Sequence, residues 1–137
     1  MRTDNLYALL PKDKHDISDI PKLAVLSDAE IQPLLPELLK WLQDMNWPVS
    51  REILKILSER IHLLESDLIK LFAPEQQDEI WKYWLLTALL PASAEKLSDK
   101  TIASVRRIAA SPTESEKIEE LHLAAQKLLQ EMNPEKS

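Results

Sequence analysis

Histidine is the first residue type to test for metal binding or proton transfer. The three histidines, His15, His62 and His122, lie on three widely separated segments. The chain has no His-Glu-X-X-His pattern and no two histidines four residues apart, the spacing that brings two imidazoles to one face of a helix. It also contains no Cys, which excludes thiolate ligands and thiol nucleophiles. We therefore expect no metal site.

Two pairs of carboxylates have a spacing that suits general acid-base chemistry. They are Asp13 with Asp16, and Asp78 with Glu79. Asp16 has the position of a helix N-cap, and Asp78 and Glu79 precede an apolar run, where acidic residues stabilise the start of a helix. No nucleophile stands out among the serines and threonines. We therefore interpret these carboxylates as groups that stabilise the starts of helices, and not as catalytic groups.

The sequence contains no Gly. Glycine supplies the positive φ angles and the close backbone approaches of phosphate-binding loops, dinucleotide-binding turns and nucleophile elbows, so these motifs are excluded. With no catalytic pattern in view, we expect that the protein is not an enzyme, and we assign no catalytic residue and no cofactor.

Tryptophan is the unusual residue type, with four Trp against a single Phe. Trp41 and Trp47 stand around one break in the helical pattern, and Trp81 and Trp84 stand in a long apolar segment. Core packing accounts for most of them, since an indole buries a large area and finds a partner for its N–H group.

Trp47 fits the core least well. It stands at a turn beside Asp44, Asn46 and Pro48, where a partly exposed ring flanked by hydrogen-bonding groups can anchor a partner. The alternative is a structural staple that holds two helices in register, because such a staple would use the same residues.

The chain carries 17 basic and 23 acidic residues, a net charge of −6. This charge opposes non-specific attraction to nucleic acid and to anionic membranes, so neither is an expected partner. The adjacent Arg106 and Arg107 are read as part of a solvated helix face. No apolar run approaches the roughly 18 residues of a membrane span, and the run before Pro11 is too short for a signal peptide. We expect a cytoplasmic protein.

Apolar residues recur at helical spacing along nearly the whole chain, and Pro, Ser, Thr and Asp separate the segments. Ser27 with Glu30, and Thr113 with Glu116, have the spacing of capping boxes, and Ser66 is expected to cap a further helix. The segment 80–90 is apolar almost all round, which predicts a central helix covered on most sides. We expect a short first element at about residues 5–10, followed by helices at about 17–26, 28–45, 48–60, 67–72 and 80–90. A further helix is centred on Ile102, Val105 and Ile108 and stops at Ser111-Pro112, and the last one runs from 114 to the end.

A weak repeat of about 34 residues links parts of the chain. Trp47 recurs as Trp81 and Leu38 as Phe72, each within a short helix, a break and a second helix. This period predicts one all-helical domain over residues 1–137, a short right-handed α-solenoid of antiparallel helical hairpins with about six to seven helices. An irregular helix bundle is the alternative.

Four segments resemble a known family in the same order along the chain. They read LLPKDKHD at 9–16, LLPELLKWLQDMNWPV at 34–49, IWKYWLL at 80–86 and IAASPTE at 108–114. The sequence resembles the family catalogued as domain of unknown function 5071. The resemblance implies a small, all-helical, HEAT-like domain of bacterial type, and it brings no known activity, cofactor or substrate.

Several of these resembling residues are polar or aromatic and lie at breaks between helices. If residues 12–16 and 44–47 lie near one another, they form a mixed-charge patch with an aromatic anchor. The alternative is that both segments tie helix ends together through caps and backbone hydrogen bonds. The candidate partner-binding residues are Lys12, Asp13, His15, Asp16, Asp44, Asn46 and Trp47.

These observations favour a non-enzymatic protein–protein interaction module. A narrower version is an immunity-protein-like role, since an acidic surface suits the basic active site of a toxin. The alternative is a small-ligand-binding protein or an enzyme with a pocket at the turn from Asp44 to Trp47. A nucleic-acid-binding protein is the third possibility, because the basic residues do not form the continuous row on one face that binding to phosphates needs.

Overall fold

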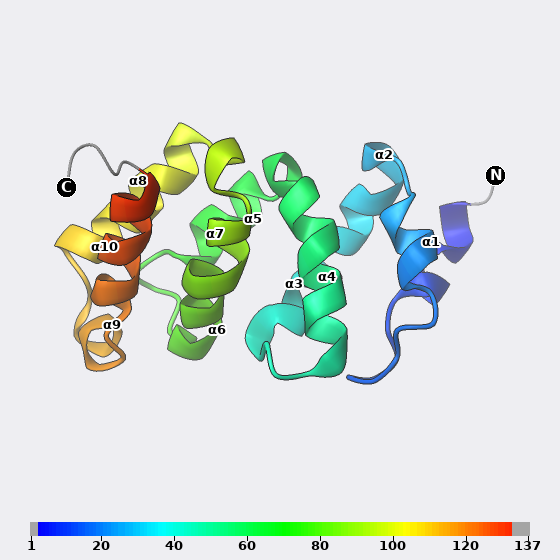
Figure 1. The fold of residues 1–137 in the computed structure, drawn as a ribbon, viewed down its shortest axis with the longest axis horizontal. Coiled ribbons are helices and arrows are strands. Elements are labelled where there is room, and N and C mark those ends of the chain that lie inside the picture. Colours follow the sequence, from blue (N-terminus) through cyan, green and yellow to red (C-terminus); the bar gives the residue numbers. More distant parts are fainter. Residues whose placement is uncertain (1–2, 133–137) are drawn as a thin grey trace.

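The computed structural model describes residues 3–132, and within that range it is all-helical with no strand (Figure 1). Short 3₁₀ helices (η1 to η4 and η6) and one π-helical turn (η5) join the α-helices. The elements in order are η1 (Thr3–Leu9), α1 (Ile20–Ala24), α2 (Asp28–Ile31), η2 (Gln32–Leu34), α3 (Leu35–Leu39), η3 (Lys40–Gln43), α4 (Pro48–Glu59), η4 (Ile61–Leu63), α5 (Glu65–Leu71), α6 (Glu79–Trp84), η5 (Leu85–Leu89), α7 (Leu90–Ala92), η6 (Ala94–Lys96), α8 (Asp99–Ala110), α9 (Glu114–Ile118) and α10 (Leu121–Met132).

Several helices begin or end where the Pro, Ser, Thr and Asp residues of the sequence predict a boundary. Both capping boxes are confirmed: the Ser27 hydroxyl accepts from the Glu30 backbone N–H, and the Thr113 hydroxyl accepts from that of Glu116. The helix expected over 28–45 is a continuous run from α2 to η3 that tightens to 3₁₀ geometry at Gln32–Leu34, which contains Pro33, and again at Lys40–Gln43, where it ends.

Two expected boundaries are wrong. Ser66 caps no helix, because α5 already begins at Glu65 with Leu64 as its N-cap residue. The single last helix expected from 114 onward is two helices, because Glu120 adopts a φ of 61° between α9 and α10. A left-handed residue cannot continue a right-handed helix, so the chain turns at this point.

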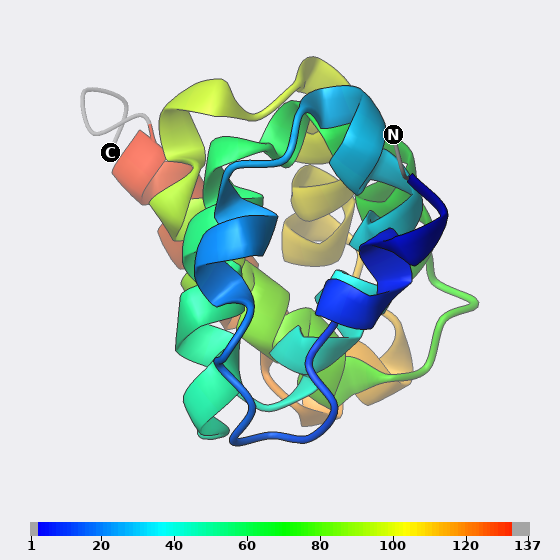
Figure 2. The same ribbon diagram turned by 90° about the vertical axis from the view of Figure 1, so that its right-hand side faces the viewer.

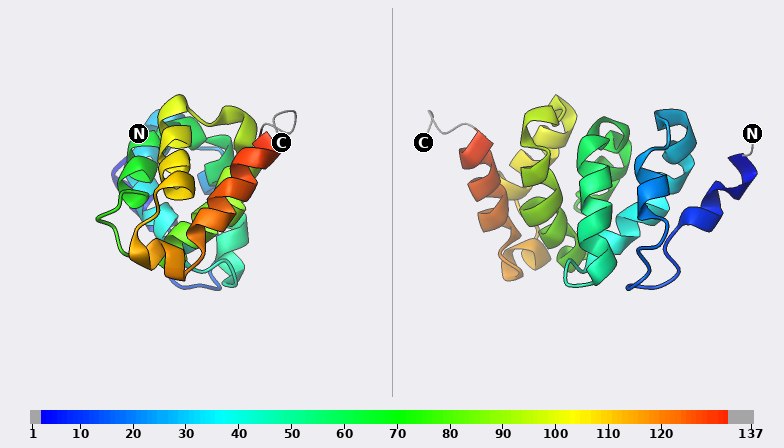
Figure 3. Two further views of the ribbon diagram at one scale, coloured as in Figure 1. Left: turned by 90° about the vertical axis from the view of Figure 1, so that its left-hand side faces the viewer. Right: turned by 45° about the vertical axis from the view of Figure 1, so that its right-hand side comes forward.

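The helices stand in a row that follows the order of the chain. Figure 1 shows α1 and α2 near one end of the long axis, α3 and α4 next to them, then α5 to α7, and α8 to α10 at the other end. The N-terminal elements cover one end of this row (Figure 2), and α10 covers the other (Figure 3). The N- and C-terminal parts of the described chain therefore lie far apart.

Side-chain hydrogen bonds between distant residues have one spacing. Among the described residues, every such bond that joins positions more than 17 apart joins positions 33 to 36 apart. Examples are Arg60 with the Ala24 carbonyl and Ser98 with Glu65. Each stretch of about 34 residues is therefore bonded to the next one along the row, which is the period seen weakly in the sequence.

A single cluster of buried apolar side chains runs through the row from Leu23 to Leu128. The expectation that segment 80–90 is covered on most sides is only half right. Leu85, Leu86 and Leu89 are buried, whereas Ile80 is 62% exposed and Tyr83 41% exposed. The first turn of this run thus leaves an apolar face open. No helix in residues 3–132 is both long enough and apolar enough to cross a membrane.

Candidate functional site

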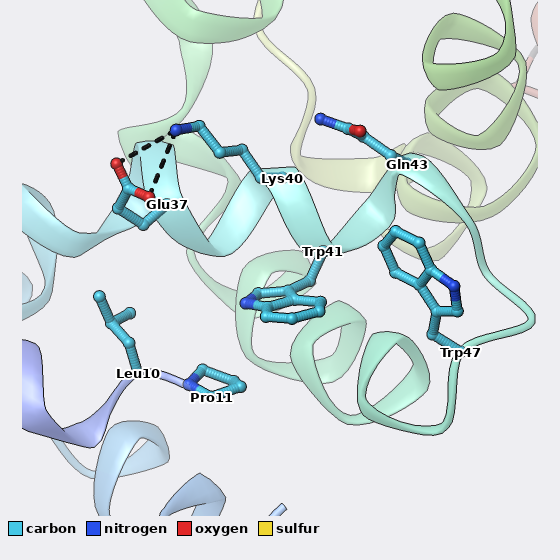
Figure 4. Close-up of a pocket in the computed structure, with 7 residues that line it drawn as sticks. All are labelled: Leu10, Pro11, Glu37, Lys40, Trp41, Gln43 and Trp47. Atoms are coloured by element: carbon cyan, nitrogen blue, oxygen red, sulfur yellow. Dashed lines mark hydrogen bonds and ion pairs between the residues drawn. The ribbon is translucent and has the colours of Figure 1, made fainter. Parts of the chain in front are cut away.

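An open hollow of about 340 Å³ lies beside the turn between η3 and α4 (Figure 4). We call it the Trp41–Trp47 hollow. The residues that line it come from the chain just after η1, from α3 and η3, and from the N-cap of α4: Leu10, Pro11, Glu37, Lys40, Trp41, Gln43 and Trp47.

Two indole rings form much of its wall. The ring centroids of Trp41 and Trp47 are 5.7 Å apart and the ring planes meet at 77°, an edge-to-face contact. Both rings are half-buried. Figure 4 shows Trp41 between Trp47 on one side and Leu10 with Pro11 on the other, and the Lys40 ammonium bonds to the Glu37 carboxylate at 3.3 Å. The hollow is thus apolar along its walls and charged at one rim.

The turn that carries Trp47 is fixed by hydrogen bonds to its own backbone. Asp44 Oδ1 accepts from the Asn46 N–H at 2.8 Å, and the Asp44 carbonyl accepts from the Trp47 N–H at 3.3 Å. The buried Ser50 hydroxyl reaches two carbonyl oxygens, that of Asp44 at 2.8 Å and that of Trp41. Pro48 then occupies the first turn of α4, where its missing N–H leaves no donor unsatisfied.

The loop of residues 12–16 lies against the same turn. The Lys14 carbonyl accepts from the Val49 N–H at 3.0 Å, which bonds the loop to the start of α4. Within the loop, Asp16 Oδ2 accepts from the Lys12 N–H and Asp13 Oδ1 from the His15 N–H, each at 2.9 Å. The two segments are therefore adjacent.

Asp16 is not the N-cap that its position suggested. The N-cap residue of α1 is Asp19, whose side chain makes no capping hydrogen bond. Asp16 instead closes the loop, and the hydrogen bond from the Ser18 hydroxyl, together with those from the backbone of Lys12 and Ser18, lowers its pKa below the ordinary value.

Of the seven predicted site residues, Trp47 alone lines the hollow. Asp44 and Asn46 shape the turn behind it. Lys12, Asp13, His15 and Asp16 form the adjoining loop. Sequence reasoning missed the other six lining residues, although all of them lie in the segments 9–16 and 34–49 that carried the family resemblance.

A comparison with known protein families places the chain in one of them. A family model described as Domain of unknown function (DUF5071) matches residues 9–129. The chain belongs to this family. No curated protein matches the sequence significantly. All seven residues of the Trp41–Trp47 hollow fall within the part matched by the DUF5071 model.

A buried ion cluster in the second half of the DUF5071 domain was not anticipated. Glu116 on α9 is completely buried, and its two carboxylate oxygens accept at 2.6 Å from Lys82 on α6 and from Arg107 on α8. The same two cations also bond to the carbonyls of Ala73 and Phe72, which follow α5. The cluster therefore ties four helices together.

The cluster corrects the reading of Arg106 and Arg107 as one solvated pair, since Arg106 is exposed but Arg107 bonds to Glu116. Burial raises the pKa of Glu116, but hydrogen bonds from Arg107, Lys82 and the Thr113 backbone outweigh burial and lower that pKa to about 2. Glu116 is therefore ionised at neutral pH.

His62 and His122 have different surroundings. His62 Nε2 lies 3.2 Å from Asp28 Oδ2, and this contact bonds η4 to the start of α2. His122 is half-buried on α10, and its Nδ1 has no hydrogen-bond partner in the described part of the chain. Among the side chains that the structure describes, no three His, Asp or Glu residues gather in a way that could hold a metal ion.

Proposed function

We propose that this DUF5071 domain is a non-enzymatic interaction module that binds a segment of another protein in the Trp41–Trp47 hollow. The observation that carries the proposal is the pair of half-buried indole rings, in edge-to-face contact, that faces an open hollow with Leu10 and Pro11 beyond. Tryptophan is, with Tyr and Arg, one of the residue types enriched among those that dominate the binding energy of protein interfaces.

The shape and chemistry of the hollow favour an extended apolar segment as its occupant. The apolar walls would cover the partner's side chains, while Gln43 and the Glu37–Lys40 pair at the rim are suited to the polar backbone of the same segment. The hydrogen bonds of the turn hold Trp47 in place before binding. A preorganised anchor loses less side-chain entropy on association.

We further propose that the helices form a short right-handed α-solenoid of HEAT-like hairpins. The uniform spacing of 33 to 36 residues in the long-range side-chain hydrogen bonds supports this arrangement, because in a solenoid each repeat contacts its neighbours in the chain. Such a row offers a long surface along which a partner can lie.

The arrangement of the carboxylates supports binding over catalysis. Asp13, Asp16 and Asp44 each accept a backbone N–H of their own loop or turn. These hydrogen bonds give each carboxylate a role in holding its own backbone in place, whereas a general base also needs an oxygen directed at its substrate. A small-ligand protein with a pocket at this turn is the second candidate, since a hollow of about 340 Å³ is within the size range of ligand pockets.

The net charge favours a basic partner. At −6 the protein attracts positively charged surfaces, as an immunity-protein-like role that neutralises a toxin would require. The same charge opposes binding to nucleic acid.

The test of the proposal is a capture experiment with a variant that fills the hollow. Gln43→Trp adds an indole at the rim, and Gln130→Trp makes the same change on the exposed part of α10, away from the hollow. We expect wild type and Gln130→Trp to retain one protein from native lysate that Gln43→Trp loses, with circular dichroism showing that all three fold. If all three retain the same proteins, or none retains any, the proposal is wrong.

Thermal-shift screening separates the small-ligand candidate. A ligand at about a hundred times its dissociation constant adds about 2.7 kcal/mol to the free energy of unfolding. A compound that stabilises wild type and Gln130→Trp but not Gln43→Trp would favour a ligand pocket over a protein-docking site.

A further inference from the structure

A second surface lies on α6 and at the end of α9. Ile80, Tyr83 and Trp84 have the i, i+3, i+4 spacing of one helix face; Ile80 is 62% exposed, Tyr83 41% exposed, and Trp84 half-buried. The rings of Tyr83 and Trp84 meet edge to face with centroids 5.1 Å apart. The other half of this helical run, η5, points its leucines into the core, so the open face is not an extension of the core.

Carboxylates border this apolar face. Two adjoining hollows, of about 430 and 240 Å³, share Glu79, Ile80 and Glu119 in their lining. Asp78 lines the first hollow, and Tyr83 and Trp84 line the second. The Ser115 hydroxyl donates to Glu79 at 2.8 Å and holds α9 beside α6. We call this surface the α6–α9 face: Asp78, Glu79, Ile80, Tyr83, Trp84 and Glu119.

The negative charge of the protein is concentrated here. Segments 77–84 and 113–120 together carry six carboxylates and two lysines, in a chain whose net charge is −6. One of these lysines, Lys82, is buried against Glu116, which leaves Lys117 as the exposed cation of the two segments. Four exposed carboxylates, Asp78, Glu114, Glu119 and Glu120, thus outnumber the single exposed lysine of the two segments.

We propose that the α6–α9 face binds a basic segment of a partner protein, one that places an apolar side chain on Ile80 and Tyr83 and directs Lys or Arg at Asp78 and Glu119. The exposed Tyr83 side chain favours this occupant further, since Arg and Lys stack on aromatic faces. A second copy of the chain does not fit, because symmetric pairing would bring the same carboxylates together. An anionic membrane surface is repelled for the same reason.

This inference rests on the proposed function in one respect: both take the binding partner to be a protein. The face shares no residue with the Trp41–Trp47 hollow, so each surface can be tested while the other is intact.

The experiment selects 12-residue peptides from a random phage-displayed library on the wild-type protein. The selected peptides are synthesised, and their affinities for variants are measured by fluorescence anisotropy. Ile80→Asp removes the apolar contact and Glu119→Lys reverses a rim charge. Val25→Asp and Glu59→Lys make the same changes at exposed positions on other elements, so they keep the net charge of their test variants.

We expect selected peptides with Lys or Arg beside an apolar residue. Their affinity should fall at least tenfold in Ile80→Asp and in Glu119→Lys, change less than twofold in the two controls, and weaken as salt is raised. The proposal is overturned if no peptide is selected, if the peptides are neutral or acidic, or if both test variants bind as wild type does. Peptides lost from Gln43→Trp alone would assign binding to the hollow, and a wild-type dimer that Ile80→Asp dissociates would assign the face to a second copy.

Discussion

Asp16 and Glu116 are two carboxyl groups with lowered pKa values, and they stand in opposite halves of the row of helices. Asp16 lies in an open loop, where hydrogen bonds from the Ser18 hydroxyl and from two backbone N–H groups hold it. Glu116 has no exposed surface, and two cations from other helices hold it. The first carboxylate organises only its own loop, whereas the second connects elements far apart in the chain.

The difference shows two ways to fix a junction between helices. The junction beside the Trp41–Trp47 hollow is held by several modest bonds to backbone carbonyls and N–H groups, each worth about 1 kcal/mol. The junction around Glu116 concentrates its polar bonding in one buried ion cluster, in which the loss of any member leaves an uncompensated charge. The first junction therefore tolerates single changes, and the second does not.

The largest expected effect comes from breaking the ion cluster. Glu116→Gln leaves Lys82 and Arg107 without their counter-charge, and removing one partner of a buried pair costs about 3–5 kcal/mol of the free energy of unfolding. Urea unfolding at pH 7 measures this loss. Glu114→Gln, on the exposed side of the same helix, should change stability by less than about 0.5 kcal/mol. Equal effects of the two substitutions would contradict the difference between the junctions.

Acid should remove the same stabilisation. The pKa of Glu116 is about 2 in the folded protein and ordinarily 4.5, so the unfolded chain binds the proton first as pH falls. The contribution of Glu116, about 3 kcal/mol, is therefore fully present above about pH 5 and is lost as pH falls toward 2. Unfolding curves measured from pH 7 to pH 2 should show the gap between wild type and Glu116→Gln closing. A gap that stays constant would mean that Glu116 does not titrate as a paired carboxylate.

A smaller loss is expected at the other junction. Ser50→Ala removes the buried hydroxyl that reaches the carbonyls of Trp41 and Asp44, and it should lower the free energy of unfolding by about 1–3 kcal/mol. Tryptophan fluorescence should shift in the folded state, because the backbone that positions Trp41 and Trp47 loosens. The comparison fails if Ser50→Ala destabilises the protein more than Glu116→Gln does.

The smallest effect is a gain in stability next to the ion cluster. Glu120 holds a φ of 61°, which costs a residue with a Cβ atom roughly 1 kcal/mol more than Gly. Glu120→Gly should raise the free energy of unfolding by about 0.5–1 kcal/mol in a thermal melt. Glu119→Gly, at a negative φ of −87°, serves as the control and should be destabilising. A lower free energy of unfolding in Glu120→Gly would show that the Glu120 side chain stabilises the fold by more than its backbone strain costs.

Local signals in the sequence predicted much of the fold. The capping boxes at Ser27 and Thr113 depend on residues three apart, and the break before Pro48 depends on one proline, so both can be read without tertiary information. The turn around Trp47 was located for the same reason. The break at Glu120 could not be predicted, since no Gly or Asn marks its left-handed residue.

The ion cluster depends on residues that the pattern of single helices does not connect. Lys82 lies within the segment 80–90, which the sequence shows only as apolar almost all round, and Glu116 belongs to a capping box. The signal that could have joined them is their spacing of 34 residues, which equals the weak repeat of the sequence. Likewise, the hollow was identified through Trp47 alone, because Leu10 and Glu37 reach it only through the packing of η1 and α3.

The most direct test of the interaction proposal is site-specific photo-crosslinking in the cells that produce the protein. A photoreactive phenylalanine analogue replaces Gln43 at the rim of the Trp41–Trp47 hollow, and in a second strain it replaces Gln130 on α10. We predict that irradiation joins position 43, and not position 130, to one other protein, which mass spectrometry of the adduct identifies. Absence of a protein adduct at position 43, or identical adducts at both positions, would contradict the proposal.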